Sequence, residues 1–253
     1  MKAIEKYAAE VREFIGVCKR LAQTQYVTSS GGNLAWRLED DLLLITPTKL
    51  YKGDINVQDL VFIDMNGKTM EGECKPTGET PMYLKFFGLR QDVRSVIHCH
   101  APHVCAMAIS GGENWLMRPI FPETTIEVGP APMVPYAEPL TEQLAENFVP
   151  FLPRYNSFLM ESHGLVSMSR GSIQETLMLV ELLELSRQVH FAGITGWEDQ
   201  RAEPAGGQGS WQYHADAWFA FIQRPRRKRF HRRLILWILP LVHRIAARIS
   251  VII

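Results

Sequence analysis

The sequence contains the stretch Val93-Arg94-Ser95-Val96-Ile97-His98-Cys99-His100, whose apolar residues predict a buried β-strand. In a strand, side chains two residues apart project from the same face, so His98 and His100 lie side by side while Cys99 faces away. This spacing suits two ligands of one tetrahedral metal ion. A hydrogen-bonded pair of core histidines would give the same pattern, so the stretch alone leaves both interpretations open.

A third histidine in a similar setting favours the metal site. His163 lies in Glu161-Ser162-His163-Gly164-Leu165, at a break between two predicted strands. Three neutral histidines with one open position describe a catalytic zinc site, because a structural zinc site normally has four protein ligands. His103 follows a proline past the end of the first strand, so we expect it beside the metal ligands or facing solvent. The sequence therefore predicts Zn²⁺ bound by His98, His100 and His163.

Outward from this stretch, the apolar pattern predicts alternating strands and helices. Apolar residues recur at three- and four-residue steps through residues 3–22, which predicts an amphipathic helix. Leu34–Leu38 and Asp41–Thr46 flank an acidic turn, which predicts a hairpin. Further strands are expected at 60–65 and 93–100, and one strand broken by a turn is expected over 157–160 and 164–168. Further helices are expected at 80–89, 102–109, 140–151 and 173–189. Such an order is typical of an α/β domain.

The helical pattern weakens after about residue 192. We therefore expect a folded domain over 1–192, an irregular region over 193–223 and a basic, apolar tail over 224–253. The first twenty residues are charged and amphipathic, which argues against a signal or transit peptide and makes a cytoplasmic location the expectation. The four cysteines show no CxxC spacing and are expected to be reduced.

The formal net charge of +0 hides an uneven distribution, because nine of the 27 basic residues lie at or after Arg224, where no Asp or Glu occurs. Residues 1–223 therefore carry 18 basic and 27 acidic side chains, a net charge of −9. A domain this acidic is not expected to bind nucleic acid.

The tail is apolar over residues 234–253 but is interrupted by Pro240 and by charged residues. A membrane span needs about 20 uninterrupted apolar residues, so we predict no transmembrane helix. A basic amphipathic helix that contacts a membrane surface or a partner subunit is the alternative to an extension without a role of its own.

Five motifs follow one another in a fixed order: Gly31-Gly32-Asn33, Ile45-Thr46-Pro47-Thr48, Lys75-Pro76-Thr77-Gly78-Glu79-Thr80-Pro81, Val96-Ile97-His98-Cys99-His100 and His163-Gly164-Leu165. Over about residues 3–190 the sequence thereby resembles the class II aldolase and adducin family, which includes fuculose-phosphate and rhamnulose-phosphate aldolases and ribulose-phosphate 4-epimerase. The resemblance implies a three-layer α/β fold, with a central mixed β-sheet flanked by helices. It also implies a homotetramer with active sites between subunits.

The resemblance assigns the substrate phosphate to loops of small and hydroxyl-bearing residues. The corresponding residues here are Gly32, Asn33, Thr48, Thr77 and Gly78. Exposed backbone N–H groups and hydroxyls hold an anion without a dedicated charge. Ordinary turns between strands would have a similar composition, so each loop taken alone leaves the question open.

Two positions depart from the family pattern. Thr77-Gly78-Glu79 stands where fuculose-phosphate aldolase has a Ser-Ser-Glu run, so one hydroxyl donor is missing. Lys49 follows Thr48 where glycine is usual. It either supplies a compensating positive charge or points to solvent.

Glu79 matches the catalytic carboxylate of the family. A zinc ion bound to the carbonyl and hydroxyl oxygens of a substrate stabilises an enediolate, while a nearby carboxylate moves the proton. The aldolases also use a tyrosine for proton transfer at the aldehyde, and the corresponding stretch 120–124 has none. Glu123 is the nearest titratable group, and the general acid is left unassigned. Tyr136, in a stretch similar to the aldolases, is expected to serve packing.

The predicted function is zinc-dependent cleavage of a ketose phosphate like L-fuculose 1-phosphate to dihydroxyacetone phosphate and an aldehyde, through a metal-stabilised enediolate with Glu79 as base. A pentulose-5-phosphate 4-epimerase, which Thr80-Pro81 resembles, and a sugar-acid phosphate decarboxylase are alternatives with related chemistry. A non-catalytic module like the adducin head domain is the alternative from another class. Such a module has no need of metal ligands, yet this sequence keeps all three histidines and the acid.

Overall fold

The computed structural model describes residues 2–119 and 121–200, and within them eight strands form one sheet in the order β4-β3-β2-β1-β5-β8-β7-β6. In this order, the strands are β4 Thr69–Glu71, β3 Val61–Ile63, β2 Leu42–Ile45, β1 Asn33–Glu39, β5 Ser95–Cys99, β8 Gly164–Ser169, β7 Ser157–Met160 and β6 Met133–Val134. All neighbouring strands are antiparallel except β6 and β7, which are parallel. The sheet is therefore mixed, as predicted.

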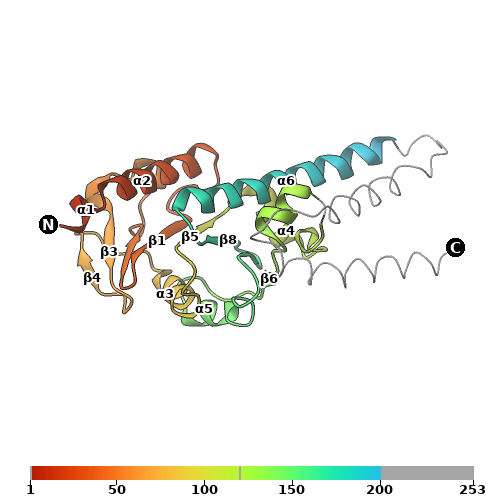
Figure 1. Ribbon diagram of the computed structural model, residues 1–253. Coiled ribbons are helices and arrows are strands. Elements are labelled where there is room, and N and C mark those ends of the chain that lie inside the picture. The colour runs from red at the N-terminus through yellow and green to blue at the C-terminus, as the bar shows by residue number, and fades with distance from the viewer. Residues whose placement is uncertain (1, 120, 201–253) are drawn as a thin grey trace, which may run out of the picture. The chain divides into compact units, whose positions relative to one another are not determined.

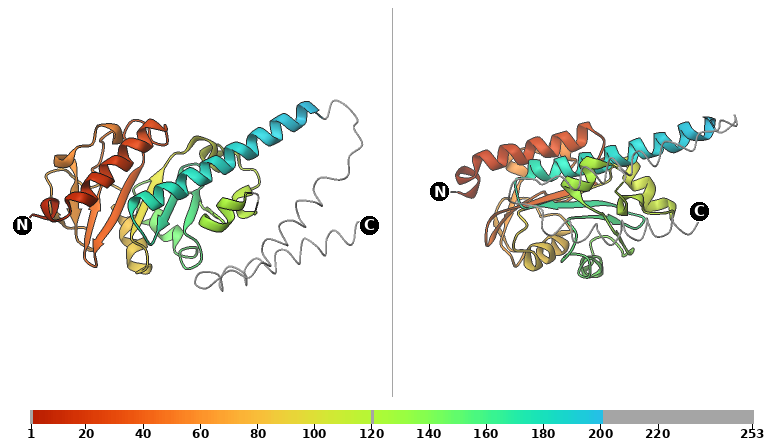
Figure 2. Two further views of the ribbon diagram at one scale, coloured as in Figure 1. Left: turned by 45° about the horizontal axis from the view of Figure 1, so that its top comes forward. Right: turned by 45° about the vertical axis from the view of Figure 1, so that its right-hand side comes forward.

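Helices cover both faces of this sheet, as Figures 1 and 2 show. They are α1 Ala3–Lys6, α2 Ala8–Gln23, α3 Thr80–Leu89, α4 Pro102–Ser110, α5 Glu142–Phe148 and α6 Ile173–Gln200. Helices α2, α4 and α6 lie on one face, while α3 and α5 lie on the other. Short 3-10 turns cover 52–54, 57–59 and 115–117, and a π-helical turn covers 124–128. The three-layer α/β arrangement expected from the sequence is confirmed.

The central strand β5 shows how the sheet divides the core into two. Side chains alternate across a sheet, so Ile97 and Cys99 pack into the core beneath α2, α4 and α6, whereas Val96 packs into the core beneath α3 and α5. His98 has the same parity as Val96. Its imidazole therefore lies on the face where α3 begins.

The local structure departs from the expected elements at three places. The helix predicted over 3–22 is interrupted at Tyr7, whose φ of −108° and ψ of 34° are not helical. The segments 157–160 and 164–168 are not one interrupted strand but two strands paired as a hairpin, with Met160 opposite Gly164. Helix α6 continues to Gln200, beyond the expected end of the helical pattern.

The division into 1–192, 193–223 and 224–253 stays a prediction. Residues 201–253, which include the whole basic tail, lie outside the described residues. Among the helices that the structure describes, none combines the length and the apolar character needed to cross a bilayer.

Candidate metal centre and its carboxylate

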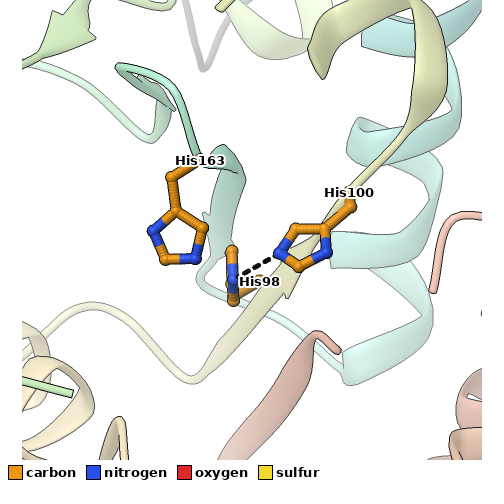
Figure 3. A group of neighbouring side chains, drawn as sticks. All are labelled: His98, His100 and His163. Carbon is orange, nitrogen blue, oxygen red and sulfur yellow. Dashed lines mark hydrogen bonds between the residues drawn. The ribbon is translucent and has the colours of Figure 1, made fainter. Parts of the chain in front are cut away.

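Three histidines from two adjacent strands gather at one point (Figure 3). His98 lies in β5, His100 follows directly after it, and His163 lies in the turn of the β7–β8 hairpin. Figure 3 shows His100 and His163 on either side of His98. The ring centroid of His98 lies 4.9 Å from that of His100 and 4.8 Å from that of His163. One ligand nitrogen from each residue lies within 4.8 Å of the other two.

The nitrogen atoms fit a divalent metal ion. The Nε2 atoms of His98 and His100 lie 3.2 Å apart, and two imidazole nitrogens bound to one tetrahedral zinc ion would lie about 3.3 Å apart. Nδ1 of His98 lies 3.0 Å from the carbonyl oxygen of Leu165. Because a carbonyl only accepts, Nδ1 carries the proton and Nε2 presents its lone pair.

Burial keeps these imidazoles in the form that binds metals. It lowers the pKa of His98, His100 and His163 to about 4 in each case. The three rings are therefore neutral at pH 7, and each offers a lone pair without first losing a proton.

Glycines leave the space that the imidazoles occupy. A Cβ atom on Gly164 would lie 2.7 Å from Cδ2 of His100 and 3.2 Å from Cε1 of His98. Gly32 has a φ of +65°, and a Cβ atom there would lie 2.9 Å from the carbonyl oxygen of His98. A Cβ atom on Gly31 would lie 3.1 Å from the ring of His100. The predicted glycine loop therefore packs directly against the histidine strand.

Glu79 stands next to the cluster, at the first turn of α3. Its carboxylate is buried, with Oε2 3.6 Å from Nε2 of His98 and Oε1 3.7 Å from Nε2 of His163. The side-chain amide of Asn33 donates to Oε2 at 2.9 Å, and the Tyr83 hydroxyl donates to Oδ1 of Asn33 at 2.6 Å. This chain of hydrogen bonds fixes the carboxylate beside the imidazole nitrogens, where it can move a proton of a metal-bound ligand.

The remaining loops of the predicted site are joined by backbone hydrogen bonds. The N–H of Thr48 donates to the Lys75 carbonyl at 2.9 Å, and the N–H of Thr77 donates to the Thr46 carbonyl at 3.0 Å. Thr77 also accepts, through its hydroxyl oxygen, from the Glu79 N–H at 3.4 Å. The structure thus brings the threonine loops to the carboxylate. Because both amides are engaged, the hydroxyl groups are the donors that these two threonines offer a ligand.

Comparison with known proteins identifies the family of this chain. Residues 12–191 match the model of the family described as Class II Aldolase and Adducin N-terminal domain. The chain belongs to the class II aldolase and adducin family.

The relatives of this chain carry the names of aldolases and decarboxylases. An L-fuculose phosphate aldolase from Methanococcus maripaludis is 30% identical over 182 residues, covering 72% of this chain and 96% of the relative. A 3-oxo-tetronate 4-phosphate decarboxylase from Pectobacterium atrosepticum is 28% identical over 173 residues, covering 68% of this chain and 79% of the relative. The crystal structure of a sugar-phosphate aldolase from Thermotoga maritima shares the fold, with a TM-score of 0.67 at 19% identity, covering 74% of this chain and 96% of that one.

The two departures from the class II aldolase pattern have structural counterparts. Lys49 is exposed and has a φ of 61°, a left-handed conformation that favours the glycine usual there. Gly78 packs beneath Leu140, and a Cβ atom on Gly78 would lie 2.9 Å from Cδ2 of that leucine. The missing hydroxyl at position 78 is therefore accompanied by an apolar side chain in the same space.

Two residues beside this cluster carry little or no signal in the sequence. Tyr83 lies one helical turn after Glu79 in the predicted helix, and this spacing is the signal that could have found it. Lys52 lies in a run of polar residues and gives no such signal, yet it is buried beside the glycine loop.

Other candidate residues lie outside the cluster. The Glu184 carboxylate lies 2.7 Å from Nδ1 of His103 and accepts from the backbone N–H groups of His103 and Val104. His103 is thus tied to α6. Tyr136 is 56% exposed, so the expectation that it serves packing is wrong. The reason is its place in an outer connection before α5, where its backbone N–H donates to the Glu161 carboxylate and its carbonyl oxygen accepts from the Asn147 side-chain amide.

Proposed function

We propose that this protein is a metal-dependent aldehyde-lyase that cleaves a ketose phosphate like L-fuculose 1-phosphate to dihydroxyacetone phosphate and an aldehyde. The observation that carries the proposal is the buried Glu79 carboxylate beside three converging imidazoles. Zn²⁺ is the proposed metal because three neutral nitrogen ligands with an open position suit it. The kinship with named aldolases supports the reaction type.

The proposed roles of the metal and of Glu79 follow from the chemistry of the bond that breaks. A divalent metal held by His98, His100 and His163 supplies a Lewis acid for the substrate oxygens. Cleavage between C3 and C4 leaves the electron pair of that bond on C3, beside the carbonyl at C2. The C4 hydroxyl gives its proton to the unassigned group at the aldehyde and becomes the aldehyde carbonyl, and that group returns the proton in the reverse addition. Glu79 moves the proton that C3 gains in cleavage and loses in the reverse addition.

The surrounding residues keep Glu79 in place for this step. Asn33 donates to one carboxylate oxygen and is itself held by Tyr83, so the carboxylate has one orientation. Burial excludes bulk water from the proton that it moves. One N–H of the Asn33 side-chain amide donates to Glu79, which leaves the second N–H of that amide as the side-chain donor for the predicted contact with the phosphate.

We place the substrate phosphate at the loops that contain Gly32, Asn33, Thr48, Thr77 and Gly78. The three loops meet beside Glu79, which supports a single subsite at a fixed distance from the metal ligands. A homotetramer with active sites between subunits and a cytoplasmic location belong to the same proposal. In such an assembly the unassigned acid would come from a neighbouring subunit.

Decarboxylation of a sugar-acid phosphate is the second candidate. The Pectobacterium relative carries that name, and residues 120–124 contain no tyrosine. Loss of CO₂ requires no group that takes a hydroxyl proton at a departing aldehyde, so this departure from the aldolase pattern favours it. A pentulose-5-phosphate 4-epimerase, which breaks and re-forms the same kind of bond, is the further alternative.

Metal analysis combined with product identification tests the proposal. We expect about one zinc ion per chain, lost in a His98→Ala/His100→Ala variant and kept in the control His103→Gln. A panel of ketose 1-phosphates, pentulose 5-phosphates and sugar-acid phosphates then distinguishes aldehyde release, epimer formation and CO₂ release. A folded protein that binds no metal after zinc is supplied would overturn the catalytic assignment and favour an adducin-like module.

Glu79→Gln separates the acid from the metal site. The variant should keep its metal, because the carboxylate is not among the three ligands, and should lose about 10²- to 10⁴-fold in turnover. Equal turnover in the variant and the wild type would exclude Glu79 as the group that moves the proton.

A further inference from the structure

Lys52 is a buried cation beside the site that the proposed mechanism does not use. It begins the short 3-10 turn 52–54, and only 1% of its surface is exposed. Burying an ammonium group is costly unless hydrogen bonds and opposite charges compensate for lost hydration. A buried lysine in a polar stretch of chain therefore calls for a specific role.

The ammonium of Lys52 is held by two backbone carbonyls. Nζ donates to the carbonyl oxygen of Ser30 at 3.2 Å and to that of Leu50 at 2.9 Å. Ser30 belongs to residues 28–33, the glycine loop, and Leu50 belongs to residues 46–50, the Thr48 loop. One side chain thus bridges two of the three loops to which the phosphate was assigned.

The two residues whose carbonyls accept from Lys52 each come directly after a residue with a strained backbone conformation. Ser29 has a φ of 50° and Lys49 has a φ of 61°, in the left-handed region that residues with a Cβ atom disfavour. Ser30 comes directly after Ser29, and Leu50 directly after Lys49. The two hydrogen bonds of Lys52 therefore act at the points where each loop needs support.

The charge of Lys52 also reaches the catalytic carboxylate. Burial lowers the pKa of the Lys52 ammonium group, while its interactions with Cys18 and Glu79 raise that pKa. The hydrogen bonds to Ser30 and Leu50 hold the positive charge at the two loops, where it favours a bound anion.

We propose that Lys52 is a positioning residue of the phosphate subsite, which fixes the glycine loop and the Thr48 loop in their left-handed conformations and at their mutual spacing. It acts through the loops, because its own side chain is too buried to contact a ligand. The inference rests on the proposed function, since it takes the substrate phosphate as the ligand of these loops.

Substitution of Lys52 by methionine tests this role, because methionine keeps the length and apolar character of the side chain and removes the three donors. The affinity for inorganic phosphate, measured by calorimetric titration of the metal-loaded enzyme, should fall about 10-fold. The KM for the phosphorylated substrate should rise by a similar factor, with a much smaller change in kcat. Lys19→Met, which removes an exposed lysine of α2, is the matched control and should change neither quantity.

A second substitution distinguishes positioning from a purely structural role. In the Lys52→Met/Ser29→Gly variant, glycine adopts the positive φ without strain, so part of the lost phosphate affinity should return. If Lys52→Met does not fold, Lys52→Arg replaces it, because arginine keeps the charge but not the compact ammonium geometry. The same loss of phosphate affinity is expected there.

Wild-type phosphate affinity in a folded Lys52→Met or Lys52→Arg variant would overturn the proposal, and so would the absence of any recovery of that affinity with Ser29→Gly. A wild-type enzyme that binds no phosphate would also overturn it. Because the titration needs no turnover, a wild-type protein that binds phosphate but is inactive on every sugar phosphate would refute the lyase assignment and leave the role of Lys52 standing.

Discussion

Replacing Gly164 by alanine should disturb the metal centre through a single methyl group. The added Cβ atom would lie 2.7 Å from the Cys99 carbonyl oxygen and 2.7 Å from Cδ2 of His100. Ordinary contacts between such atoms begin at about 3.4 Å, so the neighbours must move by about 0.7 Å. The Cys99 carbonyl is held in place because it belongs to the central strand β5. The imidazoles of His100 and His98 are therefore the groups that move.

The expected magnitude follows from this displacement. A misplacement of about 1 Å at a catalytic centre costs on the order of 10²-fold in rate. Distorted support of metal ligands costs about 10- to 100-fold in metal affinity. We therefore expect Gly164→Ala to lose about 30- to 100-fold in kcat/KM and at least about 10-fold in zinc affinity. Overpacking should also lower the free energy of unfolding by about 1–3 kcal/mol.

Zinc competition with a chromogenic chelator, steady-state rates and urea unfolding measure the three quantities. Gly16→Ala is the matched control, because Gly16 is exposed in the middle of α2 and a Cβ atom there meets nothing within 4 Å. That variant should keep its metal and its rate and gain about 0.5–1 kcal/mol in stability. Wild-type zinc affinity and rate in Gly164→Ala would refute the argument that this glycine makes room for the ligands.

Three further predictions follow from the structure. Tyr83→Phe should lower the free energy of unfolding, measured in urea, by about 1–3 kcal/mol, because the buried amide oxygen of Asn33 loses a donor; an unchanged stability would contradict it. Chelation of the metal should abolish turnover but leave the far-ultraviolet circular dichroism unchanged, since the two apolar cores do not depend on the ion, and a divalent cation should restore the rate. Arg90 holds Asp92 in a two-bond ion pair that lowers the Asp92 pKa to about 2, so its stabilisation is present above the unfolded pKa of about 4 and is lost as the pH falls toward 2. Asp92→Asn should therefore cost about 1 kcal/mol or less at pH 7, given solvent screening, and nothing near pH 2; a cost that does not depend on pH would count against the ion pair.

The sequence by itself determined which side chains of the site can bind a metal and much of the local structure. The two-residue spacing of His98 and His100 puts both imidazoles on one face of any strand, whatever surrounds it. The helix predicted over 80–89 and the strands on either side of the acidic turn at 39–40 appear in the structure, because their patterns depend only on near neighbours. The order of five short motifs was enough to indicate the family.

Only the tertiary structure decided how these parts meet. Strand β5 pairs with β1 on one side and β8 on the other, and in that register Asn33 stands opposite His98. This pairing brings Asn33 and His98 to the same Glu79 carboxylate oxygen, and no local pattern in the sequence specifies it. Likewise, Lys52 joins its own neighbourhood in the chain to the glycine loop, where its partner Ser30 lies 22 residues earlier. Residue types and spacings fix what a side chain can do, whereas pairing between distant strands fixes which side chains do it together.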